Sequence, residues 1–517
     1  MNVWSERTSW NTVVWLNVER TAELTGLKVD TIYHYVSRKD PKFPQPDSRG
    51  GRTYFAGEQV LRYILEHRRR RRSIVSRLFP RVPDPNPAQF MSAEPCNIPD
   101  IGRFAIHTWR PSDGAGPVAI AYPDRENTLH INNVPKAAAA LLNQLPPRID
   151  AVAVPNGETA SLPDDRSQTA PIVVVAERQP VYRYDPVDHG AARYKWWDLA
   201  NLLRVDLPWW SPLLNDLDAM LAWRPGASTE QITPYTPSID PGHITALASP
   251  GDSAPLCAAV DKLAQRILIR LNGRDRHDTN CLTPGLVQAA VSTVDPTEPV
   301  PELTADEAAL ILHHRADRHA ATHALRVADH WAFMPVLTHA IKISASSATA
   351  MARQWAGRLT DVAEQRRTEL GFWHVSRYMG AGVEPVRWLT DLDNPHTWAI
   401  EANNGTIYAG VGTSTPGALG QLTEAEIDHQ AAFFRDTAGQ VWPVPDTGFD
   451  YYRTGYNGAG PQRLAETLTL LAADARTDVH KPPHFDPDTD LYRLISTHDT
   501  PLTVTAELLA AARASRA

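Results

Sequence analysis

The sequence predicts an α+β protein of several domains, in which a small head and a proline-rich linker precede a large mixed body. Three observations predict this class. The chain has 517 residues, 43% of them hydrophobic, which fits roughly three domains rather than one core. Prolines gather between residues 80 and 99 and preclude a helix there. The spacing of apolar residues also alternates between strand-like and helix-like periods along the chain.

Two short helices are predicted near the N-terminus. Asn17 is placed to cap a first helix over residues 18–24, because its side chain can accept a hydrogen bond from a free backbone N–H. Gly26 and Leu27 then make a turn, and a second helix starts near Val29. The spacing of four apolar residues predicts the small core beneath these helices: Ala22, Leu27, Ile32 and Val36.

A hairpin and a third helix follow. The hairpin covers residues 43–55 and has Gly50 and Gly51 at its tip. The third helix packs Val60 and Ile64 against the first two. Two helices joined by a tight turn, a hairpin and a further helix predict a winged helix-turn-helix.

The second helix presents polar side chains that suit the major groove of duplex DNA. Lys28, Asp30 and Thr31 are predicted to face solvent, as are several residues further along the helix. Arginines at the hairpin are placed for phosphates or the minor groove. The candidate DNA-binding residues are Lys28, Thr31, His34, Tyr35, Arg38, Lys39, Arg49, Arg52, Arg68, Arg69, Arg70, Arg71 and Arg72.

These residues resemble the winged helix-turn-helix heads of the MerR and phage excisionase families. Those families share the order V-x-x-A-A-E-L-x-G-V-S-x-x-T-V-Y-R-Y-V…G-G-R-x. This chain has Val18-Glu19-Arg20-Thr21-Ala22-Glu23-Leu24-Thr25-Gly26-Leu27 and then Thr31-Ile32-Tyr33-His34-Tyr35-Val36. It departs at Thr21, where Ala is common, and at Lys28-Val29, which replaces the usual Ser-Pro and weakens the cap. The resemblance covers about a tenth of the chain and implies binding to duplex DNA.

Charge is distributed unevenly. Residues 1–82 contain 16 Lys and Arg against 8 Asp and Glu, whereas the rest of the chain contains 35 against 51. Attraction to a polyanion is therefore expected at the head, and the acidic body should repel DNA on average. The alternative is that the head docks a protein.

The arginine run, residues 68–72, is predicted to begin inside the third helix. Adjacent side chains project all around a helix, so only two or three of the five could face one DNA backbone. We expect them to add non-specific, salt-dependent affinity. The alternative is a solvated helix end.

Composition divides the chain into five segments. The head is residues 1–79, and a proline-rich linker is predicted over 80–100. A small α+β subdomain follows over 101–185, then a mainly helical region over 186–375. The C-terminal α+β domain is predicted over 376–517.

Strands in the first subdomain are indicated by short β-rich runs between Pro, Gly and Asp. They are expected at 103–109, 117–123, 128–132, 149–154 and 170–176, around a helix at 135–144. In the C-terminal region, strands are expected at 397–402, 406–412 and 440–444, and helices at 422–437, 461–475 and 504–513.

Three long helices are expected in the middle region. One is amphipathic and is stopped by Gly273. A second begins at Thr304, with Glu307 in the capping-box position. A third is expected over 348–370.

Histidines crowd the second of these helices. His319 and His323 are one turn apart and are weak candidates for a metal pair, but no Glu follows the first, so the zinc-protease pattern fails. We therefore predict ordinary surface histidines and no metal. The tryptophan pairs, Trp196-Trp197 and Trp209-Trp210, lie in apolar surroundings and are predicted to be core or interface rather than base-stacking residues.

A glycine-rich turn enters a helix near Thr454. Gly455, Gly458 and Gly460 could cradle an anion, but no Lys-Ser/Thr follows, so a structural turn is favoured. The stretch resembles the G-Y-G-G-x-G-P-x-x-L-A signature of a small actinobacterial domain family of unknown function. That resemblance implies a folded module and no activity.

No catalytic motif or cofactor is predicted. Asp391, Asp393 and Glu401 are scattered acidic residues to which no site is assigned. Cys96, Cys257 and Cys281 lie far apart, which favours a reducing cytoplasm. Association with the nucleoid is expected because the head is predicted to bind DNA. No signal peptide or membrane span is expected.

The favoured function is a sequence-specific regulator or a plasmid- or phage-type DNA-transaction factor. Homo-oligomerisation is expected because one head reads few base pairs. The body would serve oligomerisation, partner contacts or ligand sensing. The alternatives are a DNA-targeted enzyme, such as a replication initiator or nuclease, and a structural component of a multiprotein assembly.

Overall fold

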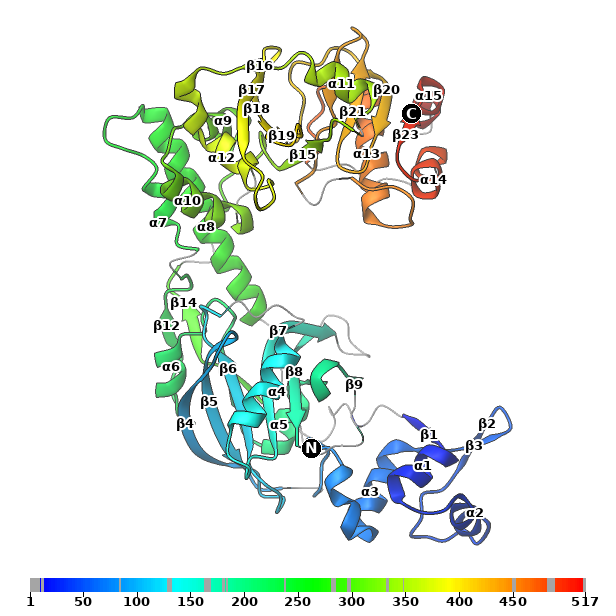
Figure 1. The fold of residues 1–517 in the computed structure, drawn as a ribbon. Coiled ribbons are helices and arrows are strands. Elements are labelled where there is room, and N and C mark those ends of the chain that lie inside the picture. Colours follow the sequence, from blue (N-terminus) through cyan, green and yellow to red (C-terminus); the bar gives the residue numbers. More distant parts are fainter. Residues whose placement is uncertain are drawn as a thin grey trace. The chain divides into compact units, whose positions relative to one another are not determined.

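The computed structural model divides into two compact units (Figure 1). Unit 1 comprises Met1–Thr236 and Leu271–Thr297, and unit 2 comprises Pro237–Arg270 and Glu298–Ala517. Both contain helices and several sheets, so the predicted mixed α+β class is confirmed. The structure describes residues 10, 14–82, 85–127, 133–161, 169–178, 182, 185–236, 239–279, 285–294, 299–331, 334–346, 348–448, 452–480 and 489–514.

Unit 1 begins with three helices and a three-stranded sheet, drawn in blue in Figure 1. The Asn17 side chain accepts a hydrogen bond from the Arg20 N–H and caps the first helix, as predicted. Gly26 ends that helix with φ +66°, a conformation that favours glycine. The elements are β1 (Trp15–Asn17), α1 (Val18–Thr25), α2 (Val29–Ser37), β2 (Asp47–Arg49), β3 (Arg52–Ala56) and α3 (Gly57–His67).

The predicted hairpin is confirmed, since β2 pairs antiparallel with β3 and Gly50 and Gly51 both have positive φ. Ile32 is fully buried, and the other three predicted core residues are partly buried against it. Phe43 completes this core, with its ring centroid 5.5 Å from that of Phe55 and 5.1 Å from that of Tyr63.

A seven-stranded sheet follows the head and forms the largest sheet of unit 1 in the described residues. Its order is β4-β5-β6-β7-β8-β10-β9, and only β6 and β7 pair in parallel. Helix α4 (Val134–Gln144) lies between those two strands in the chain and packs on the sheet. The strands are β4 (Gln89–Ile98), β5 (Gly102–Arg110), β6 (Val118–Pro123), β7 (Ala151–Ser161), β8 (Thr169–Glu177), β9 (Asp185–Pro186) and β10 (Ala191–Lys195).

The sheet corrects the predicted linker and the predicted subdomain limits. Residues 89–98 are not a polyproline connector but form β4, which pairs with β5. Pro95 is tolerated because β4 is an edge strand, where one side of the backbone needs no partner. The sheet also extends beyond residue 185 to Lys195. The expected strand at 128–132 lies outside the described residues.

Smaller elements complete unit 1. Both tryptophan pairs are buried in the core of unit 1, which is one of the two locations predicted for them. Two short parallel ladders, β11 with β13 and β12 with β14, join distant parts of the chain. These elements are the 3-10 helices at Arg69–Ile74 and Asp188–Gly190, α5 (Trp196–Leu203), β11 (Leu207–Trp209), α6 (Leu217–Ala222), β12 (Glu230–Ile232), β13 (Leu286–Gln288) and β14 (Ala290–Ser292).

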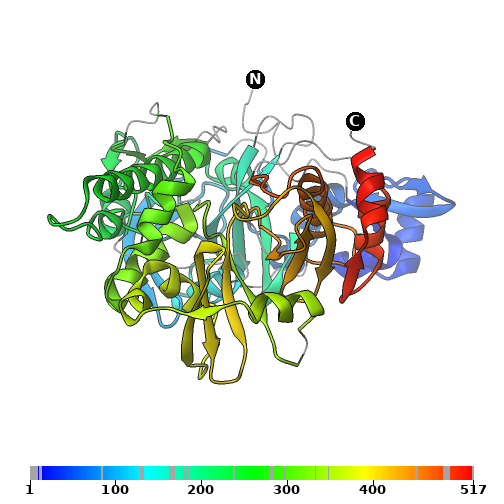
Figure 2. The ribbon, with the colours of Figure 1, turned by 90° about the horizontal axis from the view of Figure 1, so that it is seen from above.

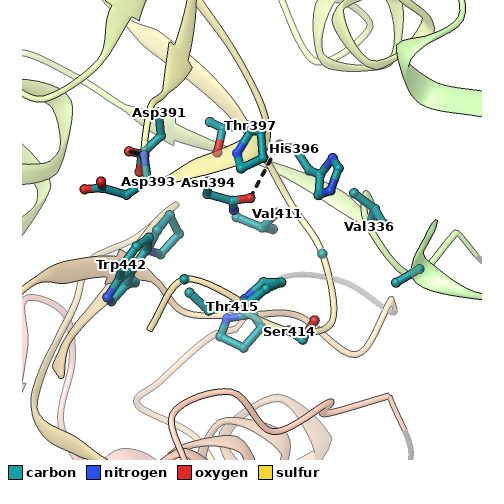
Figure 3. Close-up of a pocket in the computed structure, with 18 of the residues that line it drawn as sticks. Val336, Asp391, Asp393, Asn394, His396, Thr397, Val411, Ser414, Thr415 and Trp442 are labelled. Carbon is teal, nitrogen blue, oxygen red and sulfur yellow. Dashed lines mark hydrogen bonds between the residues drawn. The ribbon is translucent and has the colours of Figure 1, made fainter. Parts of the chain in front are cut away.

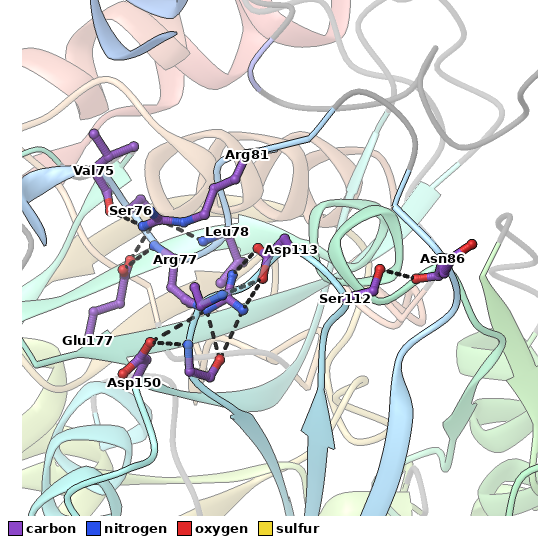
Figure 4. A network of polar contacts seen from close by, with 12 residues as sticks. Val75, Ser76, Arg77, Leu78, Arg81, Asn86, Ser112, Asp113, Asp150 and Glu177 are labelled. Carbon is purple, nitrogen blue, oxygen red and sulfur yellow. Dashed lines mark hydrogen bonds and ion pairs between the residues drawn. The ribbon is translucent and has the colours of Figure 1, made fainter. Parts of the chain in front are cut away.

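Segment Val75–Phe79 ties the head to the seven-stranded sheet through a buried polar network (Figure 4). The guanidinium of Arg77 donates to both carboxylate oxygens of Asp113, at 2.6 and 2.9 Å, and also to the Gly116 carbonyl. The Glu177 carboxylate accepts hydrogen bonds from the Ser76 hydroxyl and the Arg77 backbone N–H. The head therefore shares a core with the sheet, and residue 79 is not a free boundary.

His107 lies fully buried on β5 in an aromatic cluster. Its ring stacks on Trp223 with centroids 5.6 Å apart, and Tyr122 and Phe90 meet it edge-on. Its Nε2 lies 2.7 Å from the Met220 carbonyl oxygen. Burial lowers the pKa of His107 to about 4, so the ring stays neutral in the folded protein.

We predict that unit 1 loses stability as pH falls. Below the unfolded pKa of about 6.5, the unfolded state binds a proton that folded His107 refuses until about pH 4, which costs about 3 kcal/mol by then. Hydrogen exchange of unit 1 peptides between pH 7 and 4 measures this loss. His107→Phe should remove most of it, whereas His67→Phe, at an exposed position, should not. An equal acid sensitivity in His107→Phe would contradict the assignment.

Unit 2 contains two antiparallel sheets, of order β15-β19-β18-β17-β16 and β22-β21-β20-β23. Helices α13 and α15 pack on the second sheet, and α15 is the red helix in Figure 2. The strands are β15 (His339–Ile343), β16 (Thr360–Asp361), β17 (Pro385–Asp391), β18 (Asn394–Ala402), β19 (Ile407–Val411), β20 (Leu422–Ile427), β21 (Ala432–Asp436), β22 (Val441–Pro443) and β23 (Leu502–Val504). The helices are α7 (Gly242–Thr245), α8 (Ala254–Thr279, of which unit 2 holds the residues up to Arg270), α9 (Ala305–His313), α10 (Arg318–Trp331), α11 (Ala350–Ala356), a 3-10 turn at Glu364–Thr368, α12 (Leu370–Ser376), α13 (Ala459–Ala473), α14 (Asp490–Thr497) and α15 (Ala506–Ala514).

Several helix predictions in unit 2 are corrected. Residues 422–437 form the β20–β21 hairpin, in which Ala425, Phe433 and Phe434 are buried, so burial in a sheet overrides helix propensity. The helix expected over 348–370 breaks at Gly357. The histidine-rich helix is two helices, α9 and α10, and Gly273 does not end α8. The capping box of Thr304 and Glu307 is confirmed.

In the part of the chain that the structure describes, no helix has the length and apolar character needed to cross a membrane.

Candidate functional sites

The first candidate site is the exposed face of α2. Lys28, His34, Arg38 and Lys39 are all exposed, as predicted. The prediction that Tyr35 faces DNA is corrected, because Tyr35 is only partly exposed and its ring centroid lies 5.4 Å from that of Phe43 in the head core. Thr31 is also only partly exposed.

Tyr33 replaces Tyr35 as the exposed aromatic residue of α2, with 49% of its surface accessible. The helical spacing near the end of α2 allowed either tyrosine to face solvent. The position of Phe43, which comes from the loop after the helix, decides which of them joins the core.

The hairpin arginines differ from each other. Arg49 lies 3.7 Å above the Trp15 ring and pairs with Asp47 at 3.0 Å, so its charge is already used within the head. Arg52 is exposed and forms no ion pair within the described residues. Of the two, Arg52 is the cation that remains available to a ligand.

The arginine run corrects the sequence-based expectation. Helix α3 ends at His67, before the run, and Arg68 leads into a 3-10 helix over Arg69–Ile74. Arg68 donates to the Thr25 carbonyl at 3.0 Å, and Arg71 donates to the Glu23 carbonyl at 2.9 Å. These two side chains therefore satisfy carbonyls at the C-terminal end of α1, which have no partner within the helix.

The other three arginines of the run are exposed. Arg72 donates to the Leu65 carbonyl at 2.7 Å. Arg69 and Arg70 make no hydrogen bond or ion pair within the described part of the head. Only these two can be assigned to a ligand without the loss of an internal contact.

The second candidate site is a cavity of about 240 Å³ in unit 2 (Figure 3). The β17–β18 turn forms one wall with Asp391, Asp393 and His396. Ser414, Thr415 and Trp442 lie on the opposite wall. Two acidic residues to which the sequence assigned no site therefore meet here, whereas the third, Glu401, pairs with Arg387 at 2.9 Å.

The two aspartates of this cavity have different roles. Asp391 is buried and receives hydrogen bonds from the Arg358 guanidinium, at 2.6 Å, and from the Trp355 indole N–H. Asp393 is half-exposed, and its carboxylate lies 3.8 Å from Arg358. Asp391 thus forms a structural ion pair with Arg358, whereas the carboxylate of Asp393 is accessible to a ligand.

A hydrogen-bonded chain from the protein interior ends at His396. The buried Glu369 carboxylate lies 3.1 Å from Nδ1 of His313, and Nε2 of His313 lies 3.0 Å from Nδ1 of His396. Glu369 also accepts hydrogen bonds from Trp398 and Arg366. Hydrogen bonds from His313, Arg366 and Trp398 outweigh burial and hold the pKa of Glu369 at about 2.

This chain orients the rings of both histidines. Ionised Glu369 can only accept, so Nδ1 of His313 donates to it, and Nε2 of His313 shares a single proton with Nδ1 of His396. Burial, with a smaller contribution from His313, lowers the pKa of His396, which favours the neutral form of its imidazole.

The weak metal candidates do not assemble a metal site. Nε2 of His319 lies 3.3 Å from Nε2 of His323, and the His323 ring stacks on His243. Among the described residues, no group of three or more His, Cys, Asp or Glu is arranged to hold a metal ion.

The glycine-rich turn is built into the fold. Gly455 has φ +80°, and a side chain at this position would collide with the Asp499 carboxylate. Its N–H donates to the Ile495 carbonyl at 3.0 Å, and α13 begins at Ala459. The geometry agrees with the structural turn favoured by the sequence.

No family model, no curated protein and no solved structure matches this chain. The resemblances of the head and of the glycine-rich turn to known families remain predictions.

Proposed function

We propose that the head is a winged helix-turn-helix and binds duplex DNA, with α2 in the major groove and the β2–β3 hairpin against the backbone or minor groove. The observation that carries this proposal is the set of cations without an ion pair among the described residues: Lys28, Arg38, Lys39 and Arg52. Elsewhere in the head, Arg20, Arg49 and Arg62 pair with neighbouring carboxylates. Uncommitted cations beside an exposed helix suit a ligand with regularly spaced negative charges.

A short helix fits this role. Nine residues, Val29–Ser37, span about 14 Å, which is close to the width of the major groove. Exposed Tyr33 and His34 can contact base edges, while Arg38 and Lys39 at the end of the helix can contact phosphates. One such head reads few base pairs, so we propose that two copies bind adjacent half-sites.

The proposal is tested by selection of genomic fragments with the full-length protein. The full chain is needed because Val75–Phe79 are buried against the sheet. Enrichment of one motif, repeated about 10 base pairs apart, would support the proposal and a dimer. Capture of protein partners without enriched DNA would instead favour the docking alternative.

We predict that the arginine run divides into two functions. Arg69→Gln with Arg70→Gln should reduce the slope of log affinity against log salt by about 1–2, because up to two phosphate contacts are lost. Arg68→Gln with Arg71→Gln should leave more of the slope intact but destabilise the head by about 1–3 kcal/mol, because carbonyls of α1 lose their donors. Fluorescence anisotropy over a salt series measures the slopes, and urea unfolding measures the stability. An unchanged slope in the first double variant would remove Arg69 and Arg70 from the interface.

A further inference from the structure

A second cavity of about 470 Å³ in unit 2 adjoins the one that His396 lines. Ala305 and Ser414 belong to the walls of both, so these two residues separate the cavities. The second cavity is lined by Arg266 and Arg270, which are one turn apart on α8. Side chains four residues apart on a helix lie on the same face.

Arg266 is a buried cation, and the Coulomb attraction of the Glu302 carboxylate does not offset the burial that lowers the Arg266 pKa. Only 5% of its surface is exposed, and it forms no ion pair with any residue that the structure describes. One of its terminal nitrogens donates to the Pro301 carbonyl, whereas its buried Nε has no hydrogen-bond partner. A buried guanidinium with an unused donor is costly unless an acceptor fills the space beside it.

The surroundings of Arg266 supply further donors. Arg270 brings a second guanidinium, and Thr304, Thr413 and Ser414 bring hydroxyl groups. Two carboxylates, Glu302 and Asp478, also line the cavity, but both are exposed. Arg266 is therefore buried in the cavity wall, Arg270 is partly exposed, and the two carboxylates lie at the exposed end.

We propose that the two cavities form one binding site for a small organic oxyanion that carries hydroxyl groups. Its phosphate or carboxylate binds Arg266 and Arg270, because a guanidinium matches the geometry of both anions. A hydroxyl of the ligand forms a hydrogen bond with the His396 imidazole, whose ring Glu369 and His313 orient. Trp442 and Asp393 supply an aromatic face and a further acceptor.

Calorimetry on the full-length protein tests the site with four probes: ribose 5-phosphate, gluconate, inorganic phosphate and ribose. We expect ribose 5-phosphate or gluconate to bind with a Kd below about 1 mM, and uncharged ribose not to bind. Binding of the phosphate ester alone assigns a phosphorylated ligand, and binding of gluconate alone assigns a carboxylate. Absence of binding by both at about 10 mM would overturn the proposal.

Variants locate the two halves of the ligand. Arg266→Gln should weaken binding of the organic probe about tenfold or more. His396→Gln should weaken it about three- to tenfold but leave inorganic phosphate unaffected, because phosphate reaches only the arginines. Arg326→Gln, at an exposed position of α10 outside both cavities, should change nothing.

Folding is checked by the melting temperature of each variant without ligand. If Arg266→Gln fails to fold, Arg270→Gln takes its place and must still weaken the probe at least about threefold. Wild-type affinity in the folded arginine variants would overturn the proposal. So would an equal loss of organic probe and inorganic phosphate in His396→Gln, since that result would place His396 outside the hydroxyl contact.

Discussion

Arg77→Ala is expected to lower the free energy of unfolding of unit 1 by about 3–5 kcal/mol, because removal of one partner from a buried ion pair leaves the other charge uncompensated. The Arg77 side chain is 3% exposed and that of Asp113 is 1% exposed, so water cannot replace the lost contact. The Gly116 carbonyl loses its two donors at the same time.

Urea unfolding followed by hydrogen exchange measures this effect for unit 1 separately from unit 2. Arg77→Met combined with Asp113→Leu should cost less than Arg77→Ala alone, because no buried charge is left unpaired. Arg20→Ala, which breaks an exposed pair with Glu23, should cost at most about 1 kcal/mol. Equal costs for Arg77→Ala and Arg20→Ala would show that the network does not hold the head to the sheet.

Arg52→Ala and His34→Ala are each expected to weaken binding of the full-length protein to its selected duplex by about 1–3 kcal/mol. His34 lies on the exposed face of α2, and Arg52 follows the hairpin tip without an ion pair among the described residues. The two losses should differ in kind. Arg52→Ala should lower the affinity for all DNA sequences alike, whereas His34→Ala should lower the affinity for the selected site more than that for a random duplex.

Anisotropy titrations with the selected and a random duplex measure both losses. Arg20→Ala is the matched control, because Arg20 is a cation of the same head that is paired with Glu23 on α1. Wild-type affinity in both variants would refute the assignment of α2 and the hairpin to the interface. A loss of the same size in Arg20→Ala would indicate a general effect of charge.

The elements of the head follow from local sequence signals. Asn17 caps α1, Gly26 adopts the left-handed conformation that ends it, and Gly50 and Gly51 make the hairpin turn. Each of these effects depends only on neighbours in the chain. The sequence therefore predicts both ends of α1 within one residue and the position of the hairpin turn.

The use of individual side chains does not follow from local signals. The Arg49 guanidinium packs on the ring of Trp15, which lies on another strand, and Arg68 donates a hydrogen bond to a carbonyl at the end of α1. Strand β4 was missed because Pro95 is excluded from most strands but not from an edge, and only the whole sheet shows where its edge lies.

The site in unit 2 could not be predicted from the sequence either. Glu369 is 56 residues from His313, and His396 is 83 residues from it, so no motif joins them. The crowded histidines near residue 313 were a signal, but the partners of His313 come from the residue before α12 and from β18. Burial of Arg266 depends on the packing of α8, which amphipathic spacing alone does not give.

The most direct test of the central claim is a gel-shift titration of the full-length protein with duplex DNA in dilute buffer. We predict a complex whose affinity falls steeply as salt is added, because cations of the head displace counter-ions from the phosphates. We also predict that the selected duplex competes at least about a thousandfold better than a random one. Folded protein that leaves both duplexes unshifted at the lowest salt would contradict the account.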